Sequence, residues 1–407
     1  MIVLIKNEII KLLARRKTLV VIIAFALFAG LMAFGIYQGE RQRSKWDTVE
    51  FKIQNMKEQV EYMKRDKENA PEAIKNDEKK LAAHKQRVDE QVASMEKEIV
   101  NLEASKGKEI DWRAELKSNI TSMEAQIKSQ DDMQGGYKQE MILQLEQLKY
   151  LQAHDIKPMK EYEFNSINFT KNLIQILGMI FLSVGLAVFV SDMVSGELTP
   201  PTLKVLLTQP VSRGRVLLSK FISVSIVGVL LILLIEALYF IFIGLVFDFG
   251  NLNYPMTVGS KFAYDMSILS QDGSHPITLV AGSTYIIPVW QYIIRLFGLQ
   301  TLFILVCTAF AFMMSSILKS SMVSMAATIV VLITSIVLFQ AIGALQKYAV
   351  YSFTSYGDVA TLVDGRIATI LNKPEVNLGY ALIVFAVWGI VCYGISHVVF
   401  TKKDILI

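Results

Sequence analysis

The chain alternates between long apolar runs and polar stretches, and the runs are long enough to cross a membrane. A helix of about 18 to 20 mostly apolar residues spans the hydrocarbon core of a bilayer. Six runs reach this length: Thr18–Tyr37, Leu173–Val190, Phe221–Phe247, Phe297–Leu318, Met322–Leu345 and Leu378–Phe400. Because lipid offers no water to satisfy a free backbone, each run must be helical there. The pattern predicts six membrane-spanning helices.

A different periodicity fills the region between the first two runs. Apolar side chains recur there at three- and four-residue spacing with Lys and Glu between them, in four seams that begin at Val49, Leu81, Leu116 and Met141. Such seams are typical of coiled-coil helices. Turn-forming residues interrupt them at 69–71, at Gly107 and at 135–136. Two layouts fit: a bundle that reverses at all three breaks, or one long hairpin with its tip near Gly107.

Charge separates the same parts of the chain. Of the 78 Lys, Arg, Asp and Glu residues, 49 lie within residues 38–170. An ordinary soluble protein would not concentrate its charge in this way, because its whole surface needs polar cover. We therefore predict an all-α, polytopic membrane protein with three parts. Residues 1–37 form an interfacial helix and the first span, 38–170 an extracellular coiled-coil domain, and 171–407 the other five spans, with a cytosolic loop at 191–220.

The basic residues near the span ends predict the orientation. With the N-terminus inside, the inner segments carry twelve Lys and Arg residues and the short outer loops carry five. This excess predicts a multi-pass protein of the plasma membrane with both termini in the cytoplasm. Residues 2–17 have an apolar side and a basic side, as in a helix lying in the inner interface. The length of the first run indicates a retained span rather than a cleaved signal peptide.

Several kinds of chemistry find no support in the sequence. Both cysteines, Cys307 and Cys392, fall within predicted spans, so no disulfide framework holds the charged region. No histidine has a second ligand four residues later, so we expect no metal site. The nucleotide-binding pattern Gly-x-x-x-x-Gly-Lys-Ser/Thr is absent. The net charge of +4 comes from the inner basic residues and does not indicate a nucleic-acid partner. We expect neither an enzyme nor a bound cofactor.

The segment between the second and third spans carries the strongest local pattern. Pro201 can open a short helix and Pro210 can end it. Such a helix would expose Leu203, Leu206 and Leu207 to the cytoplasm. Apolar side chains on a short exposed helix are typical of a docking surface for another protein. A tight loop that folds back on its own bundle is the alternative.

Here the chain resembles the permease subunits of ABC-2-type ABC transporters. The resemblance is carried by Glu197, Thr202-Leu203, Leu206-Leu207, Pro210-Val211-Ser212-Arg213 and Lys220, and by the C-terminal stretch from Phe400 to Ile405. Pro201 stands where the family usually has glycine, and Ser219 replaces the glycine before the lysine. The resemblance covers the six spans and their loops but not the charged region.

The resemblance implies a half-transporter. Its cytosolic loop would couple to a separate ABC ATPase through Glu197, Thr202, Leu203, Leu206, Leu207, Pro210 and Arg213. ATP and Mg²⁺ would bind on that ATPase, and a second permease copy or a paralogue would complete the pore. The lipid bilayer surrounds the spans, and the coiled coil could meet an extracellular partner.

Two further features lie within the spans. Glu236 stands near the middle of the third span, where a carboxylate is costly and usually faces a cavity or a partner. It could line a substrate path, take up a proton or tie two helices together. Gly178 and Gly185, seven residues apart on the second span, could permit close contact with another helix, although ordinary helix packing also accounts for them.

The function that we expect is export, and two alternative hypotheses remain. ATP-driven motion could instead be carried along the first span and the coiled coil to an envelope partner, which would make the chain a transducer. A scaffold without an ATPase is a third reading, disfavoured by the loop pattern. Six spans rich in Leu, Ile, Val and Phe do not specify a substrate.

Overall fold

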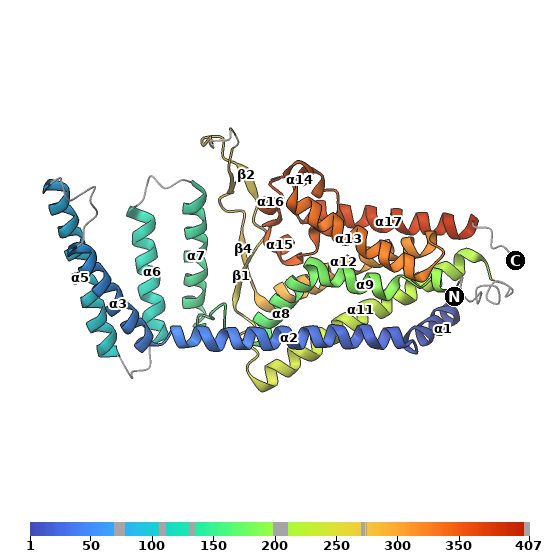
Figure 1. Cartoon of the computed structure of the whole chain (residues 1–407), viewed down its shortest axis with the longest axis horizontal. Helices are drawn as coiled ribbons and strands as arrows, with labels where there is room; N and C mark the ends of the chain where they lie inside the picture. The colour runs from blue at the N-terminus through green and yellow to red at the C-terminus, as the bar shows by residue number, and fades with distance from the viewer. Residues whose placement is uncertain are drawn as a thin grey trace. The chain divides into compact units, whose positions relative to one another are not determined.

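The computed structural model is almost entirely helical (Figure 1). It describes residues 1–68, 78–105, 111–129, 135–197, 211–269, 273 and 275–402. The chain divides into two compact units, one of Met1–Ala33 with Asn119–Ile407 and one of Phe34–Ser118.

Within these described ranges, six helices are long and apolar enough to cross a membrane, which confirms the predicted spans. Their elements are α2 (Arg16–Trp46), α8 to η2 (Ser166–Glu197), α11 (Arg213–Val246), α12 (Val289–Ile317), α13 (Ser321–Ala341) and α17 (Leu378–Lys402). Most extend beyond the apolar runs by a turn or more, because a helix continues through polar residues once its apolar part is formed. The N-terminal segment forms a separate helix, α1 (Ile2–Leu13).

The larger unit is built around α12, the most deeply buried of the spans. It packs against α17, α11 and α9 (Leu182–Val190), so its side chains are covered on several sides. Phe303 and Phe312 in α12 are fully buried and anchor two parts of the core. Large apolar residues on α2, α11, α13 and α17 stay exposed, as expected of surfaces that face lipid.

The second span is not a uniform α-helix. α8 (Ser166–Ile176) leads into a π-helical turn, η1 (Leu177–Phe181), before α9 begins. Gly178 in this turn lies against the backbone of Gly357, and Gly185 in α9 lies against the ring of Phe25 in α2. Gly185 thus makes the predicted close contact with another helix, whereas Gly178 meets the backbone of a non-helical residue. The π turn itself was not predicted, because hydropathy does not distinguish one helical winding from another.

At the end of the spans opposite α1, the loop between α11 and α12 contains two antiparallel strand pairs, together called the β-ribbon. β1 (Pro255–Val258) pairs with β4 (Tyr285–Pro288), and β2 (Phe262–Tyr264) pairs with β3 (Ile277–Leu279). The backbone of Gly259 and Ser260 donates to the carbonyls of Val363 and Asp364 at the end of α15 (Val359–Asp364). The short helices α14 (Gly343–Ala349), η3 (Phe353–Tyr356) and α16 (Ile367–Ile370) complete this end.

The smaller unit contains an antiparallel helix pair, α3 (Val49–Glu68) and α5 (Glu78–Ser105). Its buried seam joins Ile53 and Val60 to Val88, Val92 and Ile99, as the periodicity predicts. Ion pairs flank the seam in antiparallel register: Lys57–Glu103 at 2.7 Å, Lys64–Glu96 at 2.8 Å and Lys67–Asp89 at 2.5 Å. The chain therefore reverses between α3 and α5. A single hairpin with its tip near Gly107 would require both helices to run in one direction, so this layout is wrong.

Two more helices follow. α6 (Trp112–Ser129) crosses the boundary between the units, and α7 (Gly135–Ala153) belongs to the larger one. Within the larger unit, Lys149 of α7 pairs with Glu124 at 2.7 Å. α7 begins at the predicted break 135–136. The breaks at 69–71 and Gly107 lie outside the described residues.

Candidate functional site

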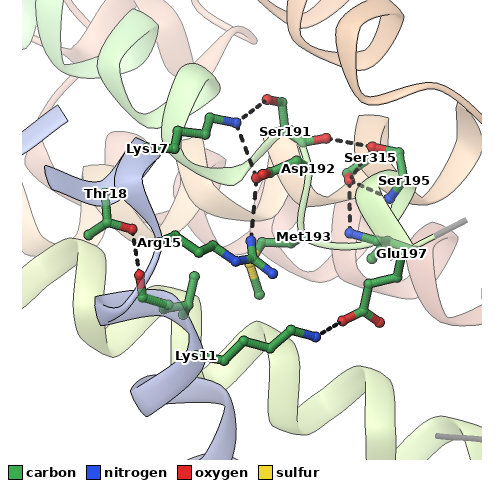
Figure 2. Close-up of polar contacts among 12 residues, drawn as sticks. Lys11, Arg15, Lys17, Thr18, Ser191, Asp192, Met193, Ser195, Glu197 and Ser315 are labelled. Carbon is green, nitrogen blue, oxygen red and sulfur yellow. Dashed lines mark hydrogen bonds and ion pairs between the residues drawn. The ribbon is translucent and has the colours of Figure 1, made fainter. Parts of the chain in front are cut away.

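Four charged side chains meet where α1, α11 and η2 (Ser195–Glu197) come together. We call them the Lys220 cluster: Glu8, Lys11, Glu197 and Lys220. The Lys220 ammonium is fully buried and donates to Glu8 Oε1 at 2.9 Å and to Glu197 Oε1 at 2.7 Å. Lys11, which is partly exposed, also donates to Glu197 (Figure 2). Two cations thus face two carboxylates, which offsets the cost of removing these charges from water.

The packing of α1 against α11 brings these groups together. α1 packs against α11, and Glu8 lies on the buried side of α1 with Leu12, one turn further on. Ser223, one turn after Lys220, donates to the backbone carbonyl of Ile5 at 3.1 Å. This side of α1 is therefore held on the first part of α11 by both polar and apolar contacts.

A second ionic contact binds the junction of α1 and α2 to the end of the second span. Lys17 lies 3.1 Å from the Asp192 carboxylate and donates to Ser191 Oγ at 3.3 Å, and Arg15 lies 3.6 Å from Asp192 (Figure 2). Thr18 Oγ1 of α2 donates to the carbonyl of Leu12 in α1 at 2.6 Å, and this bond joins the two helices at their junction. The first and second spans are thus connected at this end.

Ser315 fixes the same segment to α12. Its hydroxyl accepts hydrogen bonds from the backbone N–H groups of Val194 and Ser195, both at 3.1 Å (Figure 2). Ser195 and Ser315 are fully buried, so these bonds are not in competition with water. Residues 191–197 are consequently attached to α1, α11 and α12 at once.

Comparison with known proteins identifies the group to which this fold belongs. The family model described as ABC-2 family transporter protein matches residues 2–405. The chain belongs to the ABC-2 transporter family. It is also similar to the uncharacterized protein YhcI of Bacillus subtilis (strain 168), with 25% identity over 299 residues, which cover 72% of this chain and 84% of that protein. Members of this family are membrane-embedded transport subunits rather than enzymes.

The sequence-predicted coupling residues of this ABC-2 chain fall into two groups. Glu197 is buried in the Lys220 cluster, and Arg213 is exposed at the first position of α11. The other five, Thr202, Leu203, Leu206, Leu207 and Pro210, lie outside the described residues, which resume at 211. Glu197 and Lys220 therefore flank the predicted docking helix, one before it and one after it.

Sequence reasoning missed Glu8, Lys11, Asp192 and Ser315 as parts of this site. One signal was available for Glu8, which is the only acidic residue of the N-terminal helix and stands between Ile5 and Leu12 on its apolar side. A carboxylate at such a position requires a buried partner. The partner itself could not be read from periodicity, because Lys220 is 212 residues away.

Glu236 has a single clear partner. It is almost fully buried in α11 and accepts a hydrogen bond of 2.6 Å from Gln300 Nε2 of α12, which is buried to the same degree. This contact joins the two helices within the apolar region. Among the described residues, no group of three or more His, Cys, Asp or Glu side chains is placed to hold a metal ion.

Proposed function

We propose that this chain is the permease subunit of an ATP-driven ABC-2 exporter, coupled to a separate ATPase through the segment 198–210. The observation that carries the proposal is the Lys220 cluster, which binds both flanks of that segment to α1. A docking helix transmits motion only if its ends are firmly attached to the spans. Glu197 before the segment and Lys220 after it provide this attachment, 2.7 Å apart.

In this proposal ATP and Mg²⁺ bind on the ATPase, and closure of the ATPase pushes the docking helix. The push passes through Glu197 and Lys220 to α11, through Ser315 to α12, and through Asp192 to the first span. All three routes begin in the seven-residue segment 191–197, so one displacement of this segment moves several spans together. Glu236 and Gln300 then keep α11 and α12 moving as a pair.

The proposal places this end of the spans, with both termini, in the cytoplasm, as the distribution of Lys and Arg supports. The charged region is then extracellular, and its helix pair α3–α5 supports the coiled-coil reading. A second copy or a paralogue would pack against the exposed apolar surfaces of the spans and complete the translocation path. The substrate is unspecified.

One observation favours a second function. α2 is a single uninterrupted helix from Arg16 to Trp46, longer than a bilayer requires. Motion at its first residues could therefore reach the charged region directly. A transducer would use this motion to act on an envelope partner instead of moving a substrate.

Removing residues 42–155 and closing the gap with a short flexible linker distinguishes the two functions. A strain in which the gene for this chain is deleted should be sensitive to the exported compounds. If the chain is an exporter, the shortened chain should still protect that strain against them. The measurement is growth across a panel of toxic compounds, with the full-length chain as the positive control.

The shortened chain must also be shown to retain its ATPase by copurification. A shortened chain that keeps the ATPase but behaves like the deletion strain would favour the transducer. A shortened chain that protects the cells would make the charged region an accessory of export.

A further inference from the structure

A cavity of about 510 Å³ lies at the end of the spans opposite the Lys220 cluster. Its walls come from α7, α8, the β-ribbon and the segment around α15, all within the larger unit. α7 packs against β1 and β3, which closes one side. This cavity is separate from the proposed coupling site, and nothing in the proposed coupling mechanism uses it.

Lys171 of α8 lines this cavity without an ion-pair partner. Among the described residues its ammonium meets only the Met256 sulfur, at 4.0 Å. The carboxylates of Asp364 and Glu161 act on it electrostatically, but the described residues form no ion pair with it. Lys171 is only partly exposed, and a partly buried cation without a close anion is costly. The position is one where an anion from outside would be stabilised.

A second cation reaches the same cavity. Arg366 lines the cavity together with Lys171. Asp364 pairs with Arg366 at 2.8 Å. Burial raises the pKa of Asp364, and its bond to Arg366 opposes the rise. Asp364 is thus paired with Arg366, and among the described residues it forms no ion pair with Lys171. The other acidic side chains of the lining, Glu140 and Glu161, are exposed to water.

The remainder of the lining is amphipathic. Gln144, Gln147 and Tyr292 supply hydrogen-bonding groups. The apolar part of the wall consists of Leu143, Met159, Met256, Phe262 and Leu279. A ligand that suits both parts carries a compact anionic group next to an apolar chain. Phosphate matches the anionic part well, because its several oxygens can accept from an ammonium and a guanidinium together.

We propose that this cavity binds a phosphate group, held by Lys171 and Arg366, with the apolar wall accommodating the chain of a phosphate-bearing amphiphile. The phosphate could belong to a lipid headgroup or to a free phosphate compound. The inference does not depend on the proposed function, because it concerns binding at the other end of the spans and requires no ATPase.

The test is a thermal-unfolding titration of the purified full-length chain in uncharged detergent. Dioleoylphosphatidylglycerol should raise the melting temperature, whereas dioleoylglycerol, which has the same chains and no phosphate, should not. Lys171→Gln should weaken the apparent affinity about tenfold, as expected for the loss of one charge-assisted hydrogen bond. Lys347→Gln, an exposed lysine at the same end that does not line the cavity, is the matched control.

Two further arms complete the experiment. Lys171→Arg should retain binding. Arg366→Gln should weaken it, and because Arg366 is exposed, this variant can replace Lys171→Gln if the latter does not fold. Inorganic phosphate that produces the same shift, lost in Lys171→Gln, would support the site and identify its ligand as a free phosphate. Equal binding by Lys171→Gln and the wild type, equal effects of the two lipids, or no shift with either probe would overturn the proposal.

Discussion

Replacing Lys220 with methionine is expected to lower the free energy of unfolding by about 3–5 kcal/mol, the usual cost of removing one partner from a buried ion pair. The side chain of Lys220 is 0% exposed, and those of Glu197 and Glu8 are 4% and 9% exposed. Methionine has a similar length, so the loss is electrostatic rather than one of volume. Both carboxylates would lose their shared cation, and only Lys11 would remain beside Glu197.

Denaturant or thermal unfolding in detergent measures this effect. Lys319→Met is the matched control, because Lys319 is exposed in the turn between α12 and α13. The triple variant Glu8→Gln, Glu197→Gln, Lys220→Met should recover part of the stability, since it leaves no buried charge unpaired and Lys11 is partly exposed to water. Equal stability of Lys220→Met and Lys319→Met would show that the cluster does not stabilise the fold.

Gly178→Ala is expected to lower the free energy of unfolding by about 3 kcal/mol or more. Overpacking typically costs about 1–3 kcal/mol, and this site is at the severe end. A Cβ at Gly178 would lie 1.9 Å from the carbonyl oxygen of Gly357. The obstacle is backbone, so no side-chain rotation relieves it. The second span must then move away from the segment that precedes α15.

Gly298→Ala is the matched control, because it introduces the same methyl group on a spanning helix where nothing lies within 4 Å. Alanine there should be neutral or raise stability by up to about 1 kcal/mol, since glycine is the poorer helix former. Gly357→Ala should behave like Gly178→Ala, as its Cβ would lie 2.0 Å from the Gly178 oxygen. Unchanged unfolding of Gly178→Ala would contradict the close backbone contact.

Much of this fold could be predicted from the sequence, and particular residues show why the rest could not. The six spans follow from hydropathy, because a long apolar helix is the simplest structure that lipid accepts. The seam of Ile53 and Val60 in α3 follows from helical periodicity. That α3 pairs with α5 could not be read from periodicity, because several seams have the same spacing and compete as partners.

The candidate site was less accessible to such reasoning. Glu197 was found because a family pattern includes it, whereas Glu8 and Ser315 contribute through contacts between distant parts of the chain. The β-ribbon at 255–288 was missed because its strands of three or four residues are too short to produce a clear alternating pattern. Local sequence thus predicted the elements, and tertiary contacts decided which polar residues meet.

Residues 198–210 are proposed to dock this chain onto a separate ATPase. The most direct measurement is the amount of ATPase, and of ATP hydrolysis, that copurifies with the tagged full-length chain from its native membrane in mild detergent. The double variant Leu206→Asp, Arg213→Ala should reduce both about tenfold or more, because a charge in an apolar docking surface is costly. Its unfolding should match that of Lys319→Met, which keeps the ATPase. Undiminished copurification with the double variant would contradict the account.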